Sequence, residues 1–289
     1  IESTRRASAA FDTIGDYELA RAATQSGLAQ FEGMHALAPD NVDALFLLVK
    51  GWSGYAFGFV EDEMESAQDA GDEDMADYHR KRARMAYDRA VFYGLRALAQ
   101  KADGFDEAKK GEQSLSKWLA EHFTSQDDVP ILFWTANAWV SRVDLLKGED
   151  EEGPAFVAEL YVGVAMLERV AALDPSFEHF VPLVALGAYH ARTTVAELDQ
   201  AKQMFDTAQA KTEGKSLIVE VMYATKYACM KGDGVLYQGL LNRVLQAQDL
   251  DPQQRLANAI AKRRAKRWLG KRRAKDECGI DLAAPGPSK

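Results

Sequence analysis

The spacing of apolar residues constrains the fold of this chain more than any other feature, because it follows the period of an α-helix almost throughout. In the segment AFVAELYVGVAMLERVAAL, the apolar residues that recur every three or four positions include Leu160, Val164, Leu167 and Val170. This spacing places them on one helical face, and Pro175 ends the predicted helix. The alternating patterns of β-strands are almost absent, so the sequence predicts an all-α protein.

Small and large apolar residues also stand at repeated distances before several prolines. They follow the tetratricopeptide pattern, a helix pair of about 34 residues that ends at a proline. The residues in register are Gly27, Phe31 and Met34 before Pro39; Gly163, Leu167 and Val170 before Pro175; and Leu240, Val244 and Ala247 before Pro252. A fourth unit, over 186–208, has a longer turn. Because such helix pairs bury their apolar faces only by stacking, we predict a solenoid of tetratricopeptide-like helix-turn-helix repeats. An irregular helical bundle is the alternative.

We predict a single helical domain over residues 1–275. The acidic stretch EDEMESAQDAGDEDMAD contains Gly71 and predicts a loop at about residues 61–77. The tail ending in DLAAPGPSK predicts a flexible segment over residues 276–289. Before it, LANAIAKRRAKRWLGKRRAK forms a basic helix, for which a solenoid cap with a solvated basic face is favoured over contact with anionic lipid or an acidic partner.

The bulk properties exclude several classes of protein. A net charge of −9 makes nucleic acid a poor partner, and no apolar run approaches the roughly 20 residues that span a bilayer. The chain begins at Ile1, from which we expect a processed chain with its targeting segment upstream. Cys229 and Cys278 form no disulfide framework, and their apolar and polar contexts do not favour a bridge between them.

No pattern that carries catalytic chemistry is present. The sequence has no phosphate-binding loop, no HExxH, no CxxC and no nucleophile elbow, and its five histidines are scattered. The acidic stretch lacks the spacing of a calcium loop, so a solvated segment is favoured over a metal site. We therefore predict a protein that binds, with no catalytic residues, no cofactor and no metal.

Aromatic residues gather in several segments. Glycines interleave with Trp52 and Tyr55 in GWSGYAFGF, although each glycine costs a helix about 1 kcal/mol relative to alanine. Close helix crossing, or space beside a ligand, would explain them. In LFWTANAW, an amide stands between two tryptophans, which suits a pocket with a few polar anchors. A core role remains the alternative for each residue.

Five strings in this order resemble the T component associated with TRAP transporters, the TatT family. The strings are LLVKGWSGYAFGFVEDEME, AYDRAVFYGLRAL, VPILFWTANAWVSRVDL, LERVAALDPSFEHFVPLVALGAYHA and LANAIAKRRAKRWL. The resemblance runs from about Asp16 to Trp268, and YAFGFVEDE and LFWxxxAW are its most specific parts. The chain departs from it at Ala136, Glu178 and Val181.

The resemblance implies a periplasmic protein, anchored by a lipid on an upstream cysteine and assembled as a homotrimer. It implies association with the substrate-binding P component of a TRAP system, and a cavity for a small hydrophobic or organic-acid ligand. It carries the pocket over to these positions: Trp52, Tyr55, Phe59, Glu61, Asp62, Trp134, Asn137, Trp139, His179 and Tyr189. A protein-interaction scaffold without a ligand or a transport role is the alternative.

Overall fold

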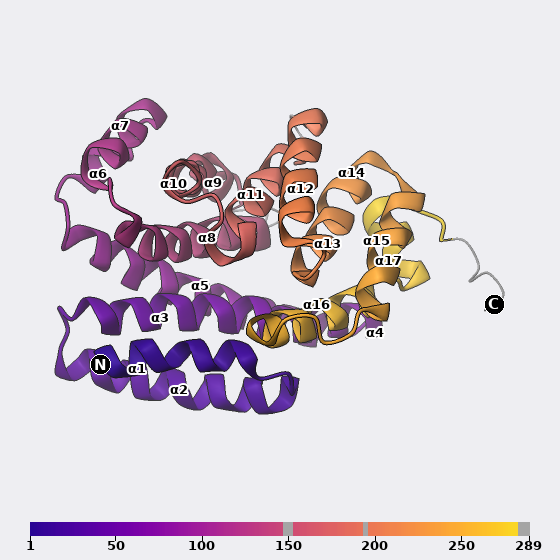
Figure 1. Cartoon of the computed structure of the whole chain (residues 1–289), viewed down its shortest axis with the longest axis horizontal. Helices are drawn as coiled ribbons and strands as arrows, with labels where there is room; N and C mark the ends of the chain where they lie inside the picture. The colour runs from indigo at the N-terminus through magenta and orange to yellow at the C-terminus, as the bar shows by residue number, and fades with distance from the viewer. Residues whose placement is uncertain (147–152, 193–195, 283–289) are drawn as a thin grey trace. The chain divides into compact units, whose positions relative to one another are not determined.

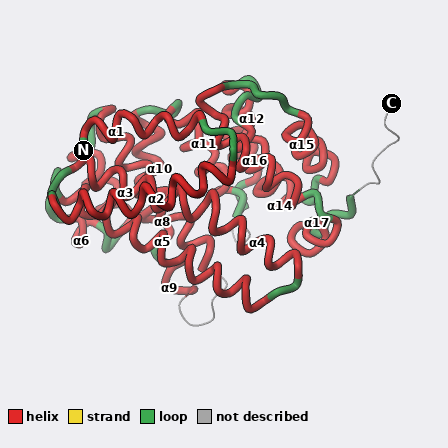
Figure 2. Tube along the Cα trace, turned by 90° about the horizontal axis from the view of Figure 1, so that it is seen from below, coloured by secondary structure: helices red, strands yellow, loops and turns green. Residues whose placement is uncertain are grey.

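The computed structural model describes residues 1–146, 153–192 and 196–282. Within these residues every regular element is a helix and no strand occurs, as Figure 2 shows. The all-α prediction is therefore confirmed. Where the sequence predicted one domain over 1–275, the structure divides into two compact units, Ile1–Glu178 and His179–Lys289. The reason is that each unit buries an apolar cluster of its own.

The first unit contains most of the long helices. In chain order they are α1 Glu2–Ala7, α2 Tyr17–Leu37, α3 Val42–Tyr55, α4 Glu61–Ala70, α5 Glu73–Ala99, α6 Phe105–Ala108, α7 Glu112–His122, α8 Val129–Leu146, α9 Gly153–Ala158 and α10 Leu160–Leu173. Short 3-10 turns cover Ser8–Thr13 and Gln126–Asp128, and a π-helical segment, Ala56–Val60, joins α3 to α4. Helix α11, Phe177–His190, begins at the end of this unit.

The second unit continues with shorter helices. They are α12 Leu198–Thr212, α13 Leu217–Met222, α14 Cys229–Lys231, α15 Gly234–Gln246, α16 Arg255–Trp268 and α17 Lys271–Cys278. A second π-helical segment, Tyr223–Ala228, joins α13 to α14, and a 3-10 turn covers Pro252–Gln254. Helix starts follow the local sequence, because Asp and Asn side chains accept hydrogen bonds from free backbone N–H groups there. Asp16, Asn41 and Asp72 do so at α2, α3 and α5.

The long helices of the first unit pack in sequence order, with α3 against α2 and α5, then α5 against α8, and α8 against α10 (Figure 1). Glycines allow two of these crossings. A Cβ on Gly94 of α5 would lie 2.4 Å from Thr135 Oγ1 of α8. A Cβ on Gly163 of α10 would lie 2.7 Å from Val140 Cγ2 of α8. The backbones therefore approach more closely than any larger residue allows.

The acidic stretch 61–77 is not the loop that the sequence predicted. Its residues form α4 and the first turn of α5, and only Gly71 and Asp72 interrupt the helix. Gly71 adopts a left-handed conformation with φ of 74°, the usual end of a helix. Two effects allow an acidic helix here. Carboxylates are favourable in the first turn of a helix, and Glu63 pairs with Arg21 and Arg82.

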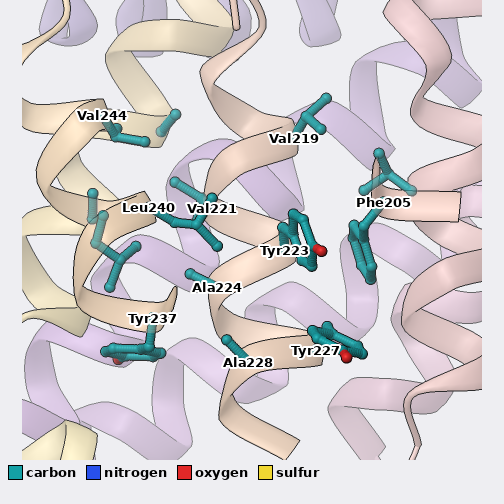
Figure 3. Packing of buried hydrophobic residues seen from close by; sticks show 14 of the residues in the cluster. Phe205, Val219, Val221, Tyr223, Ala224, Tyr227, Ala228, Tyr237, Leu240 and Val244 are labelled. Atoms are coloured by element: carbon teal, nitrogen blue, oxygen red, sulfur yellow. The ribbon is translucent and has the colours of Figure 1, made fainter. Parts of the chain in front are cut away.

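The core of the second unit is aromatic. Figure 3 shows Phe205, Tyr223 and Tyr227 on one side of it and Tyr237 with Leu240 on the other. The rings of Phe205 and Tyr223 stack with centroids 4.9 Å apart. A glycine again allows the approach of two helices, because a Cβ on Gly187 of α11 would lie 3.0 Å from Phe205 Cε2. Aromatic rings of this size supply much of the buried apolar area of the unit.

A disulfide joins Cys229 to Cys278, with an S–S distance of 2.05 Å. The sequence did not favour this bridge, since Cys278 stands in a polar segment. The prediction of a flexible tail from residue 276 is also wrong for residues 276–282. Helix α17 runs to Cys278, and Ile280 is buried. The physical reason is that the disulfide and the buried Ala274 hold this segment against α14. Residues 283–289 lie outside the described residues.

A search of the described helices for one that combines the length and the apolar character of a membrane span finds none.

Candidate functional site

A carboxylate on α2 organises the aromatic residues between α2, α3 and α5. Glu32 accepts hydrogen bonds from Trp52 Nε1 at 2.8 Å and from Tyr93 Oη at 2.6 Å. Arg89 of α5 pairs with the same carboxylate at 2.8 Å, and its guanidinium lies 5.2 Å from the centroid of the Trp52 ring. We call these four residues the Glu32 cluster. They hold Trp52 in a fixed orientation at the surface of α3.

The ionisation of this cluster follows from its hydrogen bonds. Burial tends to raise the pKa of Glu32, but hydrogen bonds from Tyr93, Trp52 and Arg89 outweigh it and lower that pKa below its ordinary value. Burial and the hydrogen bond to Glu32 raise the pKa of the Tyr93 phenol. At neutral pH the cluster therefore contains one carboxylate, one guanidinium and one neutral phenol.

The lowered pKa of Glu32 predicts a dependence of stability on pH. The stabilisation by the carboxylate is complete above its ordinary pKa of 4.5 and is lost as the pH falls through the lower pKa of the folded state. We expect Glu32→Gln to lower the free energy of unfolding by about 1 kcal/mol at pH 7, and by less at pH 3. Urea unfolding at both pH values measures this difference. An equal loss at both would contradict the assignment.

A second group of charged residues surrounds Tyr55 and the π-helical segment. The Tyr55 hydroxyl accepts hydrogen bonds from Arg82 at 2.7 Å and from Gln25 at 3.2 Å. Arg82 also pairs with Glu63 at 2.6 Å. Segments of π-helix occur frequently at functional sites, because the inserted residue redirects side chains. Here the segment turns the Phe59 ring inwards, where it lies 5.0 Å from Tyr17.

The acidic residues at the start of α4 are engaged in the fold. Tyr87 of α5 donates a hydrogen bond to Glu61. Asp62 is buried, with 4% of its surface exposed. These two predicted pocket residues thus tie α4 to the body of the first unit.

Trp134 of α8 differs from its neighbours in one respect. Its indole Nε1–H is buried and makes no hydrogen bond to any described residue. The ring packs beside Trp52 on the apolar cluster of Leu45, Leu48 and Val49. Lys50 Nζ lies 5.5 Å from the centroid of the Trp134 ring. A buried donor without an acceptor costs about 1–3 kcal/mol, so this group is available to an acceptor atom of a ligand.

Asn137 and Trp139, one turn further along α8, are both satisfied within the protein. Asn137 Nδ2 donates to Ser53 Oγ of α3 at 3.1 Å. Trp139 is buried, its Nε1 donates to the Glu159 carbonyl at 3.0 Å, and Arg142 covers its ring at 4.8 Å. Trp139 therefore has the contacts of a core residue.

The predicted site residues fall into two sets. Trp52 and Trp134 share an apolar cluster, Asn137 bonds to α3, and Tyr55, Phe59, Glu61 and Asp62 follow Trp52 along α3 and α4. His179 and Tyr189 lie in the second unit. There Arg192 lies 3.6 Å from the centroid of the Tyr189 ring.

An open depression of about 550 Å³ lies elsewhere in the first unit, between α1 and α3. Its lining includes Arg5, Asp43, Phe46 and Lys50, and none of the predicted pocket residues. Arg5 pairs with Asp43 at 2.6 Å and covers the Phe46 ring at 4.4 Å. Lys50 connects this depression to Trp134, because its ammonium group is part of the lining and also faces the indole ring.

Sequence reasoning missed the charged residues that fix the aromatic side chains, namely Glu32, Arg82, Arg89 and Lys50. One signal was available. Arg82 and Arg89 stand seven positions apart on α5, which places them on one helical face. Across the parts of the chain that the structure describes, no group of His, Cys, Asp and Glu side chains is arranged to hold a metal ion.

Helices that pack pairwise and fix aromatic side chains with charged partners define a protein of the helical binding class. A sequence model of the TRAP transporter T-component family matches residues 14–275, and the chain belongs to this family. T-components are accessory components of TRAP transporters on their periplasmic side. No curated protein matches the chain.

Proposed function

We propose that the protein is a non-enzymatic accessory subunit that binds the substrate-binding P component of a TRAP system. On this proposal it also holds a small hydrophobic or organic-acid ligand beside Trp134. Membership of the T-component family supports the transport role. The one observation that favours a ligand is the buried Trp134 Nε1–H without an acceptor.

The surroundings of Trp134 favour an organic acid. The indole N–H can donate to a carboxylate oxygen, and the nearby Lys50 ammonium supplies positive charge. Trp52, held upright by Glu32, and the aliphatic cluster beneath both rings would contact the apolar part of such a ligand. A few polar anchors in an apolar surround are the usual composition of a ligand site.

The helix packing supports a tetratricopeptide-like arrangement as part of the proposal. Small residues at Gly94, Gly163 and Gly187 allow close crossing of consecutive long helices, which is the role such repeats give to small residues. Helix pairs of this kind present extended surfaces for partner proteins, and a second copy of the chain in a homotrimer would use them as well.

The disulfide supports a periplasmic location. Disulfides persist in oxidising compartments, the bacterial periplasm among them, and are rare in the cytosol. A lipid anchor upstream of Ile1 would then hold the protein at a membrane.

The ligand proposal predicts opposite results for two tryptophans of α8. Trp134→Phe removes a donor that has no partner, so we expect unchanged stability and loss of most of the copurifying ligand. Trp139→Phe removes the hydrogen bond to Glu159, so we expect a loss of about 1 kcal/mol in stability and full ligand retention. Native mass spectrometry of freshly purified protein measures the ligand and the oligomeric state together. Wild-type protein without ligand, or full retention by Trp134→Phe, would contradict the ligand proposal.

The scaffold alternative keeps the partner and discards the ligand. Size-exclusion chromatography of the protein mixed with the P component of its TRAP system tests the partner directly. Co-elution of the two proteins, without any bound small molecule, would support the scaffold. Separate elution at all concentrations would contradict the proposed partner.

A further inference from the structure

The two helices near the end of the second unit carry an unusual concentration of positive charge. Between Arg255 and Lys275 the chain has ten Lys and Arg and no Asp or Glu, although its net charge is −9. The second unit as a whole has 18 Lys and Arg against 11 Asp and Glu, whereas the first unit has 17 against 33. The basic charge is thus confined to one part of the molecule.

The fold gives these helices one buried face and one basic face. On α16, Ala261 and Ala265 are fully buried, and the opposite face exposes Arg255, Arg263 and Lys266. On α17, Ala274 is fully buried, while the exposed cations are Lys271, Arg272 and Lys275. We call these six exposed side chains the basic face. Because the apolar sides already pack on α13, α14 and α15, the helices cap the unit and still present their cations to solvent.

The helices are held rigidly beneath this face. Tyr237 of α15 donates a hydrogen bond to the Trp268 carbonyl at 2.6 Å, and Lys262 donates to the Ala247 carbonyl at 2.6 Å. The disulfide fixes the end of α17 to Cys229. The basic face is therefore preformed and loses little conformational entropy on binding.

The carboxylates near the basic face stand at its ends. Asp249 pairs with Arg255 at 2.7 Å, and Asp281 pairs with Lys275 at 2.6 Å. Asp276 and Glu277 follow Lys275 in the sequence, outside the run of cations. The central stretch, from Lys262 to Arg273, contains cations only among its charged residues.

The type of partner follows from what this face lacks. None of the large apolar side chains between Arg255 and Leu282 is exposed. The stable centre of a protein interface needs apolar or aromatic anchors, and lysine is depleted there. A membrane that contains anionic lipid attracts clustered Lys and Arg through charge alone. We propose that the basic face binds the surface of a membrane that contains anionic phospholipids.

Vesicle binding tests this proposal. The purified chain of 289 residues is sedimented with vesicles of phosphatidylcholine alone, or with about one third phosphatidylglycerol. We expect binding to the anionic vesicles only, and loss of binding at about 0.5 M salt, where charges are screened within a few ångströms. In the double variant Lys266→Glu/Lys271→Glu, the partition coefficient should fall at least about tenfold.

A second double variant controls for total charge. Lys110→Glu/Lys117→Glu changes the net charge by the same amount at two exposed residues of the first unit, and we expect it to bind as the wild type does. Circular dichroism checks that both variants are folded. Equal binding by the two double variants, or no binding of the wild type to anionic vesicles, would overturn the proposal. So would loss of P-component binding in Lys266→Glu/Lys271→Glu with vesicle binding unchanged, since the basic face would then belong to a protein partner.

Discussion

Reduction of the Cys229–Cys278 disulfide should lower the free energy of unfolding of the second unit by about 4 kcal/mol. The bridge joins residues 49 positions apart in sequence. A crosslink that closes a loop of this length restricts the unfolded chain, and the chain-entropy relation gives a stabilisation of that size. The helices between the two cysteines, α15, α16 and most of α17, are the ones that should lose protection.

Urea unfolding with and without dithiothreitol measures this effect. The double variant Cys229→Ala/Cys278→Ala should unfold like the reduced wild type, and the reductant should leave its midpoint unchanged. Native-state hydrogen exchange locates the change, because amides of the first unit should keep their protection. Identical midpoints for oxidised and reduced wild type would show that the bridge does not stabilise the unit.

Replacement of Gly94 by alanine should destabilise the first unit by about 2 kcal/mol, although alanine favours a helix by about 1 kcal/mol. The new Cβ would lie 2.4 Å from Thr135 Oγ1 and 2.7 Å from its Cγ2. Thr135 cannot easily turn away, because its hydroxyl donates a hydrogen bond to the Ile131 carbonyl at 2.7 Å. Helices α5 and α8 would have to separate to make room.

Gly33 of α2 offers the matched control, since no atom lies within 4 Å of its added Cβ. Gly33→Ala should stabilise the unit by up to about 1 kcal/mol through helix propensity alone. Thr135→Ala should recover part of the loss in the Gly94→Ala background, because it removes the two nearest atoms. Thermal unfolding of the four variants measures these changes. Equal stability of Gly94→Ala and Gly33→Ala would show that the crossing is looser than described.

The sequence predicted the helical class correctly because helical periodicity is a local property. It misjudged the acidic stretch 61–77 for a non-local reason: the carboxylate of Glu63 becomes tolerable only when Arg21 and Arg82 arrive from other helices. The disulfide depends in the same way on α17 folding back to α14. Neither meeting is visible in a window of neighbouring residues.

For the candidate site, the strings that carry Trp52 and Trp134 led to residues that share one apolar cluster. Residue type and position did not reveal their different environments. Trp134 keeps a buried donor without an acceptor, whereas Trp139, five positions later, donates to Glu159. Whether a side chain is satisfied depends on the three-dimensional surroundings, which spacing alone cannot supply.

The π-helical segment Ala56–Val60 sets the rotational phase of α4 relative to α3. Each residue of an α-helix advances the chain by about 100° around its axis, so a single-residue deletion that turned this segment into regular α-helix would rotate α4 by that angle. Glu61 would then point away from Tyr87, and Glu63 away from Arg82. Length changes in this stretch should therefore be tolerated only in steps that restore a full turn.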